Sequence, residues 1–316
     1  MNTLVIENSK TGLAVEKGQL WVRSPESTQS VPLKSLDTLI LGKEQKLDVR
    51  LLQKLVGSGI TIVCPDSHTT ENSLVISGAN SKTVHRRITQ YGCVRDPAFT
   101  LEETRRVVTL KLEAQLTVLE AWKRSLTSHT RSLHKALQFH QAGLELIRHA
   151  HSLNALRGYE GTLQKAWFES YFQLFSDTIC RGKRSRQPPE DPVNALLSLG
   201  YTLLYKEMVS AIQGACLDPY LGFFHQPVSG RFSLACDLME PLRVHIDQFV
   251  YRLIAEQSLR AHHFGTQNKA CLLTKAGKPV FFKAWHVHKA PWVQACQNAA
   301  RAFAQTVDAF HSQEAA

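Results

Sequence analysis

The sequence predicts an α+β protein in which a β-rich, sandwich-like N-terminal domain precedes a larger all-helical domain. One change of pattern and the chain length support this prediction. Short apolar or alternating runs, separated by turn residues, fill the first 80 residues, whereas from about Val84 the apolar residues fall at helical spacing almost to the end. The chain has 316 residues, which is too many for one ordinary core. We therefore place the two domains at residues 1–84 and 85–316.

The N-terminal domain is expected to contain several strands and one helix. The helix spans Asp48–Gly57, because its apolar residues share one face and Gly57-Ser58-Gly59 ends it. Ile60–Cys64 then predicts a buried strand. The strands predicted before the helix are Thr3–Glu7, Leu13–Glu16, Gln19–Arg23 and Leu36–Leu41.

The second domain is expected to be helical apart from one small hairpin. In the helix that starts at Pro192, Asp191 is suited to the N-cap and Pro192 to the first helical position. The hairpin would pair Cys271–Leu273 with Val280–Phe282 around Ala276-Gly277-Lys278. The predicted helical stretches include Leu101–Leu126, Ser132–Leu153, Pro192–Gln213 and Pro241–Leu259.

Composition narrows the class of protein. The net charge of +10 favours a polyanionic partner such as nucleic acid, although ordinary basic solubility explains it equally well. The chain has seven cysteines, an odd number, and no C-x-x-C motif. This argues against a disulfide framework and against a structural zinc site. No apolar stretch approaches the roughly 18 residues of a membrane helix, and the N-terminal residues do not resemble a signal peptide. We therefore expect a cytoplasmic protein.

Carboxylates and a histidine stand at positions in the second domain where helix packing alone would not require them. Glu160 lies between Gly158 and Gly161, and the missing side chains would let a large ligand approach. The alternative is that Glu160 stands at a helix N-terminus, where the positive end of the helix dipole stabilises its negative charge. His225 closes an apolar segment, where a hydrogen-bonded core histidine is the alternative to a metal ligand.

Asp237 and Glu240 are three residues apart, so on a helix they would share a face. Paired carboxylates attract a hard divalent cation. The same spacing before an apolar run also predicts a capping box, with Asp237 as the N-cap and Glu240 at the third helical position. A histidine together with carboxylates suits Mg²⁺ or Mn²⁺ with open positions for phosphate oxygens and water. The residues alone therefore indicate possible metal-dependent phosphodiester chemistry.

A basic loop accompanies these groups. Four of the six residues from Arg181 to Arg186 are basic, with no acidic residue among them. Such a loop can neutralise phosphates and position a duplex without reading its sequence. The alternative is a solvated charged loop.

Four blocks of the sequence, taken in their order along the chain, resemble the CRISPR-associated adaptation integrases, the Cas-one family. The resemblance covers most of the helical half, whereas the first 80 residues agree only in kind and size. The blocks are Arg157-Gly158-Tyr159-Glu160-Gly161, Pro188–Tyr201, Leu217–Pro219 with Gly222–His225, and Ser233–Arg243.

The resemblance implies a β-rich first domain and a helical catalytic domain. It implies that Glu160, His225 and Glu240 bind the Mg²⁺ or Mn²⁺ ion, and that Asp237 supports this catalytic site. It also implies a homodimer that assembles with a dimer of the small Cas-two protein. The substrate would be duplex prespacer DNA, whose 3′-OH ends are joined by transesterification to the CRISPR repeat beside the leader.

Six further residues are expected to contact DNA, on charge, on proximity in the sequence or on the family pattern. They are Lys165, Arg184, Arg186, Arg231, Asn194 and Tyr205. For Tyr205, a core aromatic with its hydroxyl at the surface is an equal alternative. Two other functions stay open: a metal-dependent structure-specific nuclease or transposon-type integrase on the same scaffold, and a non-catalytic DNA-binding scaffold.

Overall fold

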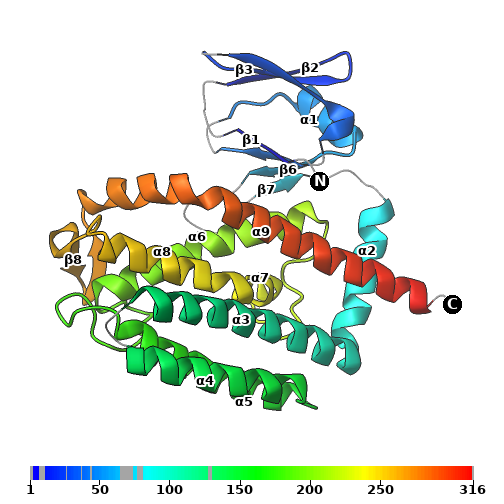
Figure 1. Cartoon of the computed structure of the whole chain (residues 1–316). Coiled ribbons are helices and arrows are strands. Elements are labelled where there is room, and N and C mark those ends of the chain that lie inside the picture. The colour runs from blue at the N-terminus through cyan, green and yellow to red at the C-terminus, as the bar shows by residue number, and fades with distance from the viewer. Residues whose placement is uncertain are drawn as a thin grey trace.

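The α+β class is confirmed by a computed structural model, which describes residues 3–6, 11–25, 27–36, 38–42, 45–64, 74–76, 81–126 and 130–314. The strands of the first 76 residues form one region and the long helices form a second, larger one (Figure 1). In this view α6 and α9 lie on the side of the helical region nearest the strands, and α4 and α5 lie on the opposite side.

Two sheets pack together in the N-terminal region. The first has the order β1-β5-β6-β7, with β1, β5 and β6 parallel and β7 antiparallel to β6. The second is the antiparallel meander β2-β3-β4. The strands are β1 (Thr3–Ile6), β2 (Gly12–Glu16), β3 (Gln19–Arg23), β4 (Thr28–Pro32), β5 (Thr38–Leu41), β6 (Thr61–Cys64) and β7 (Leu74–Ile76).

The N-terminal core forms where strand and helix side chains meet. Helix α1 (Val49–Gly57) begins one residue after the predicted start, because Asp48 is its N-cap and its carboxylate accepts a hydrogen bond from the Leu51 N–H at 2.8 Å. Leu55 of this helix is fully buried beside strand residues such as Leu39 and Ile62. The predicted strands are confirmed in outline, and Glu7 lies outside the described residues. Strand β4 was missed, because Thr28-Gln29-Ser30 is mostly polar and exposed.

The helical region is built on one extensive core. Helix α6 packs on α7, α8 and α9, and α3 packs on α4 and α5. Asp191 caps α6 as predicted, by accepting a hydrogen bond from the Asn194 N–H at 2.8 Å. The helices are α2 (Ser81–Arg95), α3 (Pro97–Ser125), α4 (Thr130–Arg148), α5 (Leu153–Phe172), α6 (Pro192–Gly214), α7 (Ser233–Met239), α8 (Arg243–Ala255) and α9 (Gly277–Glu314).

The junction of the two regions lies close to the predicted position. The strands end at Ile76 and α2 begins at Ser81. The boundary at residue 84 remains a prediction. Contact between the regions is close at the end of α6, where a Cβ built on Gly214 would lie 3.3 Å from Oγ1 of Thr38 in β5.

The predicted hairpin is correct only for one of its strands. Cys271–Leu273 belongs to β9 (Ala270–Leu273), but its partner is β8 (Phe264–Gln267). Val280–Phe282 instead lies in α9. The prediction placed the turn at the glycine, whereas Asn268 and Lys269 form it with φ values of 49° and 66°. Among the described residues, no helix is both long and apolar enough to cross a membrane.

Two glycine substitutions should change stability in opposite directions. In Gly200→Ala the new methyl would lie 2.5 Å from Cγ2 of Ile246 on α8, so we expect a net loss of about 1–3 kcal/mol. In Gly92→Ala the methyl meets nothing within 4 Å, so we expect a gain of roughly 0.5–1 kcal/mol from helix propensity. Urea unfolding of both variants measures the effects. Changes of equal sign would contradict the tight contact of α6 with α8.

Candidate functional site

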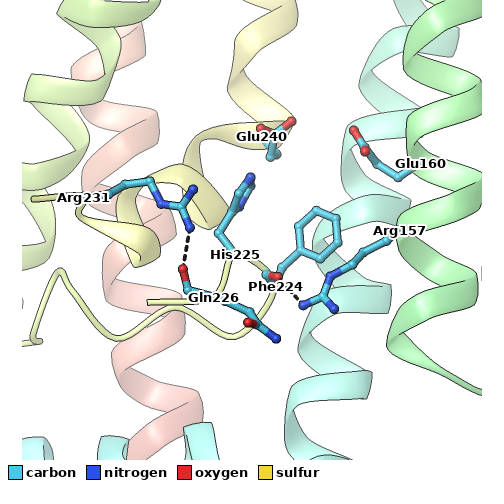
Figure 2. Close-up of a pocket in the computed structure, with 7 residues that line it drawn as sticks. All are labelled: Arg157, Glu160, Phe224, His225, Gln226, Arg231 and Glu240. Atoms are coloured by element: carbon cyan, nitrogen blue, oxygen red, sulfur yellow. Dashed lines mark hydrogen bonds between the residues drawn. The ribbon is translucent and has the colours of Figure 1, made fainter. Parts of the chain in front are cut away.

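The three predicted ligands line one pocket, although they come from distant parts of the chain. The pocket has a volume of about 290 Å³. Figure 2 shows the His225 imidazole and the carboxylates of Glu160 and Glu240 around the same space. Its lining residues are Arg157, Glu160, Phe224, His225, Gln226, Arg231 and Glu240. The structure therefore brings together Glu160, His225 and Glu240, while their roles as ligands remain a prediction.

Glu160 projects from the middle of a helix. Since α5 begins at Leu153 and ends at Phe172, the alternative that placed Glu160 at a helix N-terminus is wrong. A Cβ built on Gly158 or on Gly161 meets nothing within 4 Å. Both glycines are exposed, so this part of α5 has no side chains at these two positions that would keep a bulky substrate away.

Asp237 fixes the segment that carries His225. This fully buried carboxylate accepts hydrogen bonds from the backbone N–H groups of Phe223 at 2.7 Å, Phe224 at 3.1 Å and His225 at 2.8 Å. It also lies 2.6 Å from Nδ1 of His225. This network assigns the proton of the neutral imidazole to Nδ1, which leaves Nε2 to accept a ligand or a proton. Burial raises the pKa of Asp237, while its bonds to His225 oppose that rise.

The capping-box interpretation of Asp237 and Glu240 is wrong. Asp237 lies inside α7, whose N-cap, Phe232, makes no side-chain capping bond. Glu240 begins the separate 3-10 turn Glu240–Leu242. Asp237 is therefore not a helix cap, and its oxygens serve the loop that ends at His225. That loop needs Gly222, because a Cβ there would lie 2.7 Å from the Asp237 carboxylate.

Glu240 is buried among positive charges. It is 7% exposed, and its carboxylate lies 2.6 Å from Nζ of Lys111 and 3.4 Å from Nη1 of Arg243. Burial raises the pKa of this carboxyl, but the charges of Lys111 and Arg243 outweigh burial and lower the pKa to about 2. Glu240 is therefore ionised at neutral pH.

Lys111 is the main residue that the sequence analysis missed. It lies on α3, is 4% exposed, and donates hydrogen bonds to both Glu160 and Glu240. A signal was present, since the lysine falls on the apolar face of a predicted helix, beside Val108 and Leu112. A buried lysine requires a partner, so this position points to a carboxylate.

The side chains of this pocket are of the types that bind a divalent cation, but they are not arranged around one ion position in this structure. Two carboxylates and an imidazole with a free Nε2 are ligands that Mg²⁺ and Mn²⁺ accept. Within the described part of the chain, however, no three Asp, Glu, His or Cys side chains are placed to hold a metal ion. The Lys111 ammonium bonds the carboxylates that such an ion would need, and thereby stands in for a cation.

A buried network supports the pocket from behind. The Arg243 guanidinium stacks over the ring of Tyr201 at 4.1 Å. The Asp247 carboxylate accepts hydrogen bonds from the Tyr201 hydroxyl and, at 2.9 Å, from Nε1 of Trp167. Burial raises the pKa of Asp247 to about 6, although the bond from Tyr201 and the charge of Arg243 limit the rise. Arg243 and Glu240 are thus held by a rigid layer of side chains.

Some of the predicted DNA-contacting residues are accessible. Arg231 lines the pocket and donates to the backbone oxygen of Gln226. Lys165 extends from α5 with 79% of its side chain exposed, and Arg186 is exposed in the loop before α6. Arg157, which was quoted in a sequence block but not proposed as a contact, also lines the pocket. Their contacts with DNA remain predictions.

The other three have partners inside the protein. Arg184 donates to Oδ1 of Asn194 at 2.8 Å and to Oγ of Ser198 at 3.2 Å. Asn194 is fully buried. Tyr205 is half-buried, and its hydroxyl accepts a hydrogen bond from the Phe232 N–H at 2.9 Å. In this conformation Asn194 organises the basic loop, so a direct DNA contact through its side chain would require that loop to move.

Comparison with known proteins gives a consistent result. A family model described as CRISPR associated protein Cas1 matches residues 4–287. A protein of Thermodesulfovibrio yellowstonii named CRISPR-associated endonuclease Cas1 1 is 31% identical, over 93% of this chain and 92% of its own length. A Mycobacterium tuberculosis protein named CRISPR-associated endonuclease Cas1 is 30% identical, over 81% and 75% of the two chains.

Solved structures share the fold. A chain of a partial Cas6-RT-Cas1–Cas2 complex superposes with a TM-score of 0.82 at 20% identity, covering 99% of this chain and 96% of that chain. A casposase bound to an integration product gives a TM-score of 0.76 at 21% identity, with coverage of 97% and 95%.

Replacing Asp237 should destabilise the whole protein. Asp237→Ala leaves three backbone N–H groups and the His225 imidazole without their acceptor, so we expect a loss of roughly 3–5 kcal/mol in the free energy of unfolding. The control is Asp218→Ala, which removes the acceptor of one N–H, that of Tyr220, from a more exposed position. Urea unfolding should give a loss of under about 1 kcal/mol for the control. Equal losses would refute the role of Asp237.

The buried Asp247 should make stability depend on pH. Its folded pKa of about 6 exceeds the ordinary value of 3.8, so between these values the folded state holds a proton that the unfolded chain has lost. The stability of the wild type relative to Asp247→Asn should therefore fall by roughly 2–3 kcal/mol as the pH rises from about 4 to about 6, and then level off. Asp177→Asn, at an exposed aspartate, is the control. A difference that does not change between pH 4 and pH 7 would contradict the raised pKa.

Proposed function

This chain belongs to the Cas1 family of CRISPR-associated proteins, and we propose that it is a divalent-metal-dependent DNA integrase and endonuclease of CRISPR adaptation. The observation that carries the proposal is the convergence of Glu160, His225 and Glu240 on one pocket. The names of the relatives support endonuclease activity. The casposase structure, which holds an integration product, supports joining as well as cutting.

The proposed reaction exchanges one phosphodiester for another. The 3′-OH of the prespacer attacks a phosphorus atom at the repeat boundary, a new P–O bond forms, and the bond to the departing 3′ oxygen breaks. No ATP is consumed, because the number of phosphodiester bonds is conserved. Glu160, His225 and Glu240 would hold the Mg²⁺ or Mn²⁺ ion, which when bound polarises the phosphate and neutralises the charge that develops on its oxygens.

The residues of the chain have distinct tasks in this proposal. Asp237 fixes the tautomer of His225, so that Nε2 is the atom directed toward the reaction. Arg157 and Arg231 at the pocket wall would bind phosphate oxygens on either side of the reacting group. The exposed backbone at Gly158 and Gly161 would let the duplex approach α5 closely.

The proposed partners are double-stranded prespacer and repeat DNA, a second copy of this chain, and a Cas2 dimer. The printed titles of the structural neighbours, which include a Cas1–Cas2 complex and a DNA-bound casposase, support DNA and Cas2. A cytoplasmic location agrees with these partners and with seven cysteines that are all free, and we propose no membrane partner.

An alternative is a structure-specific nuclease or transposon-type integrase that uses the same residues. The similarity to a casposase supports this alternative at the level of the fold. The substrate decides between the two, since a CRISPR repeat would be joined efficiently in the first case and transposon ends in the second.

Alanine substitution at the three predicted ligands should abolish joining. With a duplex bearing 3′-OH ends, a CRISPR-repeat plasmid and Mn²⁺, we expect the Glu160→Ala, His225→Ala and Glu240→Ala variants to form strand-transfer products at least about a hundredfold more slowly. Gel analysis of the joined products measures the rate.

Matched controls are Glu145→Ala and His149→Ala, whose side chains are 61% and 81% exposed. Both should react at the wild-type rate. If the three site variants keep full activity while folded, as judged by circular dichroism, the site assignment is wrong. If the wild type binds DNA but neither cuts nor joins it under any metal condition, the protein is a scaffold.

A further inference from the structure

A lysine bridges two of the three predicted metal ligands. Lys111 reaches from α3 to Glu160 on α5 and to Glu240 on the 3-10 turn, and so ties three separate elements together. Its Nζ lies 2.6 Å from the Glu240 carboxylate and is also bonded to Glu160. Only 5% of the Lys111 side chain is exposed, so the ammonium depends on these carboxylates in place of water.

The charges around this ammonium are already balanced. Glu160 and Glu240 contribute two negative charges, and Lys111 with Arg243 contributes two positive charges. A divalent cation needs the same carboxylate oxygens, and it would enter a space where a fixed positive charge repels it. The ammonium and the divalent cation thus have the same partners.

We propose that Lys111 is a built-in counter-ion that competes with the divalent cation for Glu160 and Glu240. In the metal-free protein it holds the two carboxylates together, and it gives up at least part of this pairing when the cation binds. Lys111 thereby weakens metal affinity while stabilising the metal-free fold. This inference rests on the proposed function, because it presupposes that Glu160 and Glu240 bind a metal ion.

A purely positioning role for Lys111 predicts the opposite effect on affinity. If the lysine only holds the carboxylates in a metal-ready arrangement, its removal lets them separate, and metal binding becomes weaker. If the lysine competes, its removal leaves Arg243 alone to offset the two carboxylates, and metal binding becomes tighter. The sign of the change in affinity therefore separates the two roles.

The test is calorimetric titration of metal-free protein with Mn²⁺, without DNA. Lys111→Met removes the charge and keeps a side chain of similar length. We expect Mn²⁺ to bind this variant roughly tenfold or more tightly than the wild type, and the melting temperature of the metal-free variant to fall by several degrees. Added Mn²⁺ should raise the melting temperature of the variant by more than that of the wild type.

The control is Lys135→Met, which removes the same charge from an exposed residue of α4. It should leave both Mn²⁺ affinity and melting temperature unchanged. Should Lys111→Met be unfolded without metal, folding that Mn²⁺ restores supports the proposal. In that case Lys111→Gln, which keeps a hydrogen-bond donor without the charge, supplies the affinity comparison.

Two results overturn the proposal on Lys111 alone. One is equal or weaker Mn²⁺ binding by the Lys111 variants, and the other is an unchanged melting temperature of the metal-free variant. If the wild type and every variant fail to bind Mn²⁺, the metal site and with it the proposed function are also wrong.

Discussion

The pairing of two carboxylates by one buried ammonium is the interaction on which the site depends. Glu160 and Glu240 would repel each other at this short separation, and Lys111 makes their approach favourable. The lysine comes from α3, which packs against α5, α8 and the 3-10 turn. The convergence of these elements is therefore both a packing arrangement and an electrostatic one, and a change in either would disturb the other.

The side chains behind the pocket explain how charged groups can be buried there. Arg243 is bonded to Glu240 and stacks on Tyr201, and Tyr201 is bonded to Asp247. Each polar group in this series has a partner, which offsets part of the cost of removing it from water. The basic loop is organised in the same way around Asn194, which fixes its fold before any substrate is bound.

The fold class, most helices and the three pocket residues could be predicted from the sequence. Helical spacing located α6 to within a residue at each end, because Asp191 and Pro192 mark its start. Glu160, His225 and Glu240 could be proposed only through the order of four family-like blocks, since each alone had an ordinary structural explanation. Contacts between segments that are distant in the chain could not be predicted from the sequence. Spacing could not reveal that Asp237 serves the 223–225 backbone, or that Lys111 meets Glu160 and Glu240.

The hydrogen bonds that Asp237 accepts determine which residues near His225 can be substituted. Its carboxylate accepts hydrogen bonds from the backbone amides of residues 223–225, which every residue type except proline provides, so these bonds do not require particular side chains there. The exposed residue Gln226 follows His225 and lines the pocket, and its backbone amide is not one of the three that bind Asp237. A substitution at Gln226 can therefore change the pocket wall while the imidazole of His225 keeps its anchor.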